Sequence, residues 1–218
     1  MNHLLIANLP KWPQMVVTGT KISREQALEI IRRTDQFLGF PMGNDRAFSE
    51  KVKKTLKMPE EYSEQAKWLE DWGYIWTEYV VNDWICSDFI DGAYGWCHPD
   101  GTIGYAYNIG KWPSVSEVLK EWETLAAAFP FLEVEATLMS AEYGEVGFPV
   151  VSFLIRNGSV ELVDPAQRNI HKEFDRMAPK TNDNNDLFVR ISMGDYSLGE
   201  KIPIEIIEGW AKARKGKT

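Results

Sequence analysis

The 218-residue sequence predicts an α+β fold, in which helices cover one face of an antiparallel sheet. Two long amphipathic segments each begin with a capping box, the side-chain pattern that marks a helix start. Segments with alternating apolar residues lie before and after them, which is typical of strands with one buried face. The predicted order is strand, helix, two strands, helix, strand, and this is the order of the split βαβ or ferredoxin-like fold.

The first strand and helix are predicted in the N-terminal part of the chain. The strand is centred on the Met-Val-Val run at 15–17 and ends at a glycine. Ser23 and Gln26 form the first capping box, and apolar residues at spacings of three and four continue the helix to Leu38. Residues 40–72 are expected to be an insertion after this helix, with a short lysine-rich helix and a second short helix near its end.

The middle of the chain is predicted to contain two strands, over Tyr74–Ile85 and Gly101–Ile109. A second capped helix follows, with Ser114 and Glu117 as its capping box. This helix should end at Phe129, because the proline that follows cannot continue it.

Further strands are expected after that helix. Phe131–Met139 alternates apolar and polar residues, and its polar face carries Glu133 and Glu135. A hairpin is predicted over Pro149–Val163, because Asn157-Gly158 supplies the left-handed conformations that a two-residue turn needs.

This assignment divides the chain into two parts. Residues 1–163 are interpreted as one ferredoxin-like domain with the insertion at 40–72. Residues 164–218 are interpreted as a C-terminal extension of helices and a strand that packs on the same core. Its last helix begins with a proline and ends in lysines and arginine, which favour the negative end of the helix dipole.

The composition restricts the partners. With 32 acidic and 24 basic residues, the formal net charge is −8, which argues against duplex DNA or an anionic membrane, since both are bound mainly by lysine and arginine. A partner with a basic surface is expected instead. Two cysteines, no secretion leader and no apolar run of about 18 residues predict a protein of the reducing cytoplasm that spans no membrane.

The sequence offers little catalytic chemistry. It contains no phosphate-binding loop, dinucleotide fingerprint or serine-hydrolase elbow. Cys86, Cys97 and His98 are an incomplete zinc set with poor spacing, so neither a metal nor another cofactor is expected. His98 follows Cys97, but adjacent side chains of a strand point to opposite faces, and His171 is expected on a polar helix, so no catalytic residue is predicted. Glu142, Glu145 and Glu161 could converge on Asp88 or Asp91 and hold a divalent ion in a hydrolase, but chance proximity is the preferred explanation, because about one residue in seven is acidic.

Two tyrosines of the strand 101–109 alternate with small residues. If Gly104 and Ala106 pack against the bulky helix residues, Tyr105 and Tyr107 lie on the open face of the sheet. RNA-recognition domains stack bases on such a face, although the net negative charge argues against single-stranded RNA here. In the other arrangement, the C-terminal extension covers this face.

Short aromatic motifs suggest a family. Pro10-Lys11-Trp12 before the first strand, Asp71-Trp72-Gly73-Tyr74-Ile75-Trp76, and Phe129-Pro130-x-Leu132 at the helix exit resemble the YubB-like proteins of phages and plasmids. The likeness covers roughly Leu9 to Val163. It implies a ferredoxin-like domain, carriage on a mobile element and a place in the cytoplasm of a bacterium, and it implies no catalytic residues.

Two classes of function remain. The first is a non-enzymatic binding protein of a phage or plasmid, such as an inhibitor of a host defence or regulatory machine, whose partner is a host or phage protein with a basic surface. The second is a small-ligand or nucleotide-binding protein, with or without hydrolysis, that uses an aromatic pocket. The predicted binding residues are three aromatic residues and four glutamates: Trp76, Tyr105, Tyr107, Glu133, Glu135, Glu142 and Glu145.

Overall fold

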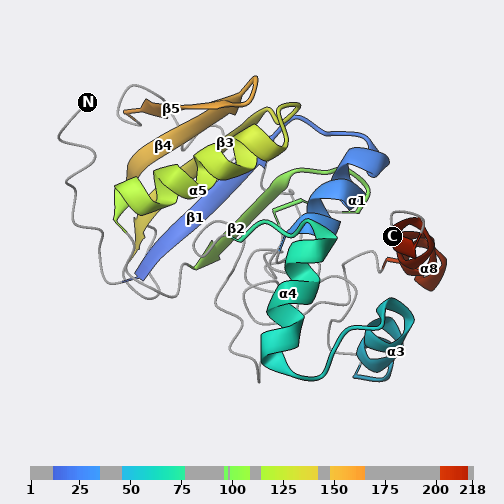
Figure 1. The fold of residues 1–218 in the computed structure, drawn as a ribbon. Helices are drawn as coiled ribbons and strands as arrows, with labels where there is room; N and C mark the ends of the chain where they lie inside the picture. The colour runs from blue at the N-terminus through green and yellow to red at the C-terminus, as the bar shows by residue number, and fades with distance from the viewer. Residues whose placement is uncertain are drawn as a thin grey trace, which may run out of the picture.

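The computed structural model describes residues 12–34, 46–76, 96–97, 99–108, 114–141, 148–164 and 202–215 (Figure 1). This part of the chain is an α+β structure, as predicted. Its elements are, in chain order, β1 (Trp12–Gly19), α1 (Arg24–Arg33), α3 (Arg46–Leu56), α4 (Tyr62–Trp72), β2 (Gly104–Asn108), α5 (Val115–Ala128), β3 (Val134–Ala141), β4 (Phe148–Arg156), β5 (Ser159–Val163) and α8 (Ile204–Lys215).

The five described strands form one antiparallel sheet in the order β2-β1-β3-β4-β5. The chain passes from β2 through α5 to β3, so β1 lies between two strands that are joined by a helix. Most of the strand predicted over 74–85 lies outside the described residues. The complete ferredoxin-like arrangement therefore stays a prediction.

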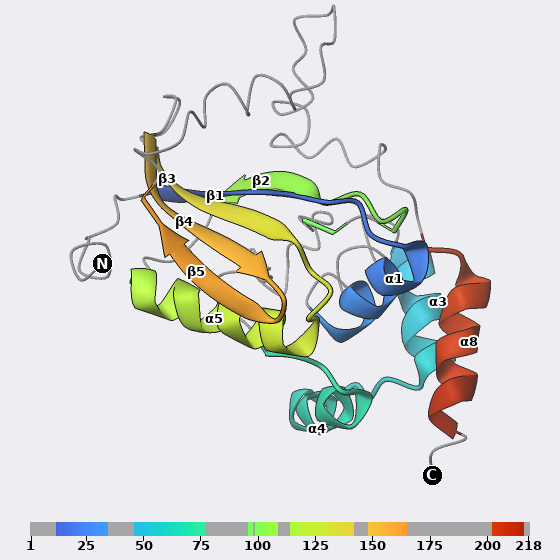
Figure 2. The same ribbon diagram turned by 90° about the horizontal axis from the view of Figure 1, so that it is seen from above.

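Helices α1 and α5 cover the same face of the sheet, as Figure 2 shows. Ala27 and Ile30 of α1 and Trp122 of α5 are fully buried in one hydrophobic cluster with the sheet. The sheet contributes alternate residues of its three central strands to the same cluster. These residues are Met15, Val17, Val134, Ala136, Leu138, Val151, Phe153 and Ile155.

Both predicted capping boxes are present. The Ser23 hydroxyl accepts a hydrogen bond from the Gln26 backbone N–H at 3.2 Å, and the Ser23 N–H donates to the Gln26 side chain at 3.0 Å. The same exchange joins Ser114 and Glu117 at the start of α5. The predicted Asn157-Gly158 hairpin is also confirmed, with φ angles of 51° and 73°.

The first helix ends earlier than its apolar pattern predicts. The prediction continued it to Leu38, but α1 ends at Arg33 and Thr34 is extended. The chain after α4 explains this end, because the Ile75 N–H donates to the Arg33 carbonyl at 2.7 Å. The Trp72 indole donates to the Arg32 carbonyl at 2.9 Å. Contacts that are distant in sequence thus satisfy the last carbonyls of the helix.

Helices α3, α4 and α8 form a second layer beyond α1. Val52, Leu56, Trp68, Leu69 and Ile207 are buried there in a cluster of their own, to which α1 contributes Ile31. The expectation was that the C-terminal extension packs on the sheet core. Its described helix, α8, packs instead with the helices of the insertion. Residues 165–201 lie outside the described residues, so the division at 163 and 164 stays a prediction.

Stacked aromatic and cationic groups join the helices of this layer. The Trp68 and Trp72 rings stack with 5.0 Å between their centroids. The Arg214 guanidinium of α8 lies 4.6 Å from the Trp68 centroid, and that of Arg32 lies 5.6 Å from the Trp72 centroid. These cation–π contacts tie α8 to α4 and α4 to α1. Within the described ranges, no helix has the length and apolar character needed to cross a membrane.

Candidate functional site

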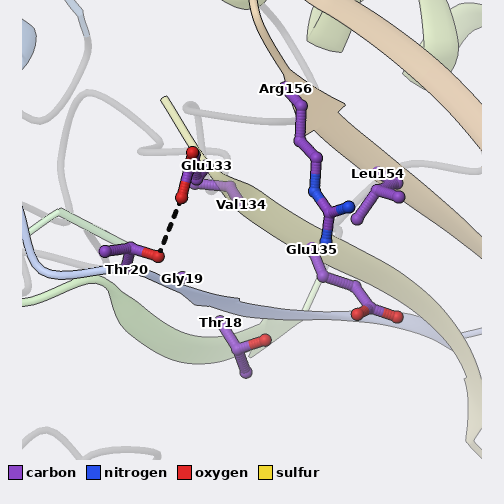
Figure 3. A pocket seen from close by; sticks show the side chains of 8 residues that line it. All are labelled: Thr18, Gly19, Thr20, Glu133, Val134, Glu135, Leu154 and Arg156. Atoms are coloured by element: carbon purple, nitrogen blue, oxygen red, sulfur yellow. Dashed lines mark hydrogen bonds between the residues drawn. The ribbon is translucent and has the colours of Figure 1, made fainter. Parts of the chain in front are cut away.

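A hollow of about 430 Å³ lies at one end of the sheet, on the face opposite α1 and α5 (Figure 3). Its first row of side chains comes from three neighbouring strands, because the register pairs Thr18 with Glu135 and Glu135 with Leu154. In an antiparallel ladder, directly paired residues share a face. We call this feature the sheet-end hollow.

A second row extends the hollow past the strand ends. The Thr20 backbone N–H donates to the Glu133 carbonyl at 3.0 Å, and the Thr20 hydroxyl donates to the Glu133 carboxylate at 3.3 Å. Arg156 closes this row from the last position of β4. Two carboxylates, two hydroxyls and one guanidinium therefore line one small surface.

The Arg156 guanidinium is available to a partner. Figure 3 shows its side chain reaching across the hollow toward Glu135 and Leu154. In the part of the chain that the structure describes, it makes no hydrogen bond or ion pair, and the residue is exposed. An arginine that is held over acidic neighbours but keeps its donors free suits recognition of a planar acceptor.

The floor of the hollow requires a glycine. A Cβ at Gly19 would lie 2.7 Å from the Glu133 carbonyl oxygen and 2.8 Å from the Ile103 Cγ2 atom. A side chain at position 19 would therefore press on the backbone of Glu133, whose carbonyl accepts the hydrogen bond from the Thr20 N–H.

A tight turn supports the segment that leaves the hollow. The Ile22 N–H donates to the Gly101 carbonyl at 2.9 Å. The Asp100 carboxylate accepts hydrogen bonds from the Thr102 N–H at 2.9 Å and from Lys21 Nζ at 3.2 Å. The Thr102 backbone bond is the main cause that lowers the pKa of Asp100 to about 2, and the Thr102 hydroxyl and Lys21 contribute.

This turn should make stability depend on pH. The pKa of Asp100 is about 2 in the folded protein against an ordinary 3.8. A lowered pKa stabilises the fold above pH 3.8, and this contribution is lost as the pH falls to about 2. Because the side chain is 47% exposed, we expect no more than about 1 kcal/mol.

Urea unfolding of wild type and Asp100→Ala, at neutral pH and at about pH 2.5, measures this contribution. The variant should be less stable at neutral pH, and the difference should shrink in acid. A stability difference that stays constant over this range would contradict the assigned role of the carboxylate. Comparing the two proteins cancels the titration of all other carboxyls.

Only part of the predicted site comes together. Glu133 and Glu135, which were predicted as binding residues, both line the sheet-end hollow. Trp76 lies elsewhere, just after α4, where it is 55% exposed and contacts the Tyr74 ring edge-to-face at 4.9 Å. Glu142 and Glu145 lie outside the described residues.

The register of β2 with β1 bears on the face to which positions 105 and 107 belong. The register pairs Tyr105 with Val17 and Tyr107 with Met15, and both partners are buried against the helices. Paired positions share a face, so positions 105 and 107 belong to the helix-facing side. The open-face arrangement depended on Gly104 and Ala106 packing against the helices, and this register does not favour that packing.

The opposite face of the sheet is not open at its centre. Thr137 and Ser152 are paired there, with their hydroxyl oxygens 2.8 Å apart, and they are 4% and 0% exposed. A stacking platform for bases needs an accessible row of aromatic side chains. The buried hydroxyl pair and the tyrosine register both argue against that use of the sheet.

Comparisons with family models, with curated proteins and with solved structures find no match to this chain. The candidate site therefore rests on its own residues and geometry.

Arg156, Thr18 and Thr20 were not predicted as site residues. Strand alternation could have placed Arg156 on the polar face of β4. It could not have shown that β4 lies beside β3, because neighbouring strands are chosen by the tertiary fold. The glutamates were found because they alternate within one strand, which is a local signal.

The described residues offer no evident metal site. Cys97 is fully buried, and burial raises the pKa of its thiol, which disfavours the thiolate that binds metals or attacks substrates. Cys86 and His98 lie outside the described residues. Among the residues that are described, no three histidine, cysteine or acidic side chains gather as metal ligands would.

Proposed function

We propose that the protein is a non-enzymatic binding protein whose partner is a protein with a basic surface, held at the sheet-end hollow. The observation that carries this proposal is the convergence of Glu133 and Glu135 beside the free guanidinium of Arg156. Carboxylates of this kind accept short, charge-assisted hydrogen bonds from lysine or arginine.

The arginine adds specificity to this surface. A uniformly basic partner segment would meet repulsion from Arg156, whereas a segment with an acidic residue beside its basic ones could pair with Arg156 as well as with the exposed Glu133. Complementary patterns of charge select partners and orient their approach. Arginine is also among the residues that contribute most to binding at protein interfaces.

The alternative function, a small-ligand or nucleotide site made of Trp76, Tyr105 and Tyr107, has less support. Trp76 follows α4, and the two tyrosine positions lie on the helix-facing side of β2. Hydrolysis would also require a base or metal site, for which the described residues give no candidate.

The fold and the resemblance to YubB-like proteins define the setting of this proposal. The order β2-β1-β3 fits the ferredoxin-like arrangement if the predicted strand at 74–85 pairs beside β2. We propose that the chain is carried by a phage or plasmid and binds its partner in the bacterial cytoplasm, as an inhibitor of a host machine.

The test compares Glu133→Gln/Glu135→Gln with wild type in affinity capture from a bacterial lysate, followed by binding kinetics with the captured protein. The double variant should associate about tenfold more slowly at low salt, with a flatter salt dependence and a dissociation rate that changes less. Charged groups at an interface govern mainly the encounter of the two proteins.

A matched control removes two charges elsewhere. Glu70→Gln/Glu123→Gln alters exposed residues of α4 and α5 and gives the same net charge. The control should associate like wild type. Equal slowing of both variants would show that only net charge matters, and normal binding by the hollow variant would eliminate the proposed site.

A further inference from the structure

Two basic segments that are far apart in sequence meet in the helical layer. Helices α3 and α8 pack against one another, and Figure 2 shows them side by side with their C-terminal ends toward the same end of the molecule. The α3 segment and the last turns of α8 each carry a run of basic residues. The fold therefore brings the two helices that carry these basic residues together.

Four exposed lysines make up what we call the lysine surface: Lys51, Lys54, Lys57 and Lys212. Glu50 is the one acidic residue of α3, and its carboxylate pairs with Lys53 at 3.3 Å. The Arg214 guanidinium is turned inward onto the Trp68 ring. The four lysines carry the positive charge of this surface, on a chain whose net charge is −8, and the exposed Glu208 of α8 lies four positions before Lys212.

The residue type indicates the kind of partner. Lysine is depleted at protein–protein interfaces, where arginine is enriched. A strongly hydrated ammonium on a flexible stem binds phosphates as a point charge, without requiring a fixed geometry. Each neutralised phosphate releases counterions, which supplies the driving force even for a surface with few shaped contacts.

We propose that the lysine surface binds the phosphate backbone of a single-stranded nucleic acid. A flexible strand can bend its phosphates onto the adjacent ends of two helices. A rigid duplex would bring many more phosphates toward the negative remainder of the protein. The proposal is independent of the sheet-end hollow, because the residues that line the hollow belong to strands and their ends and not to α3 or α8.

Basic residues near the C-terminal end of a helix also interact favourably with the negative end of the helix dipole. That effect acts on stability, and it is confined to the last turn. Lys51 is also exposed, but it lies before the last turn of α3, where the helix dipole has little effect. Measurements of binding and of thermal stability therefore distinguish a role in binding from a role in stabilising the helix.

The experiment measures binding of a fluorescein-labelled 20-nucleotide oligo(dT) by anisotropy, between about 50 and 200 mM NaCl. If four phosphates are neutralised, the logarithm of the association constant should fall with the logarithm of salt at a slope of about −3, roughly a 60-fold loss over this range. Lys51→Gln/Lys54→Gln should reduce the slope to about −1.4, and Lys212→Gln should reduce it to about −2.

The control variant Lys67→Gln/Lys120→Gln removes two exposed lysines from α4 and α5. It should bind like wild type, and all variants should melt within a few degrees of wild type. Three results would overturn the proposal: no binding by wild type in low salt, equal weakening by the control, or displacement of the strand by a polyglutamate peptide at equal charge concentration. An unchanged slope for Lys212→Gln would show that the two helices do not form one surface.

Discussion

Replacing Gly101 by alanine is expected to destabilise the protein by about 3 kcal/mol, since strain at a positive φ and a lost buried contact add together. Gly101 has a φ of 90°, and a Cβ there would lie 2.0 Å from the Ile22 carbonyl oxygen. The neighbouring atom belongs to the backbone, so no side chain can rotate away. The turn must move, and the hydrogen bond from the Ile22 N–H to Gly101 would be lost with it.

Urea unfolding followed by far-UV circular dichroism measures this loss. Gly209→Ala is the matched control, because nothing lies within 4 Å of the position where its Cβ would be. In the middle of α8, that change should raise stability by up to about 1 kcal/mol. Wild-type stability of Gly101→Ala would contradict the close contact between the turn and the segment after β1.

Truncating Trp122 should have an even larger effect. The side chain is 0% exposed, and its ring lies 5.7 Å from the buried Trp96 ring. Trp122→Ala should cost about 3 to 5 kcal/mol, because it removes buried apolar surface and leaves a cavity between α5 and the sheet.

Trp122→Phe tests whether packing is the cause. Phenylalanine keeps most of the ring contacts, and the described residues provide no acceptor to the indole N–H that would be lost. We therefore expect a cost below about 2 kcal/mol. The two variants are compared by their denaturant midpoints. If phenylalanine costs as much as alanine, the role of this tryptophan is not apolar packing.

Local signals explain the parts of the fold that the sequence predicted well. A capping box involves residues three apart, and the Asn157-Gly158 turn involves adjacent ones, so both can be recognised without knowledge of the fold. The alternation that placed Glu133 and Glu135 together is also a property of a single strand.

Contacts distant in sequence explain the errors. The end of α1 depends on Trp72 and Ile75, which reach its last carbonyls from beyond α4. The sides taken by Tyr105 and Tyr107 depend on the register with β1. Arg156 lies in the candidate site because β4 pairs with β3. No sequence pattern within β4 indicates that β3 is its neighbouring strand.

Helix α1 has a position between the two layers that affects the behaviour of the whole molecule. It contributes Ala27 and Ile30 to the sheet core and Ile31 to the helical cluster. Opening either layer would therefore expose one side of the same helix and weaken the other layer. Local opening of this kind costs more free energy when two packed units share an element. The cooperativity of the fold thus depends on one helix of ten residues, which links the end of the sheet with the hollow to the helices that carry the lysines.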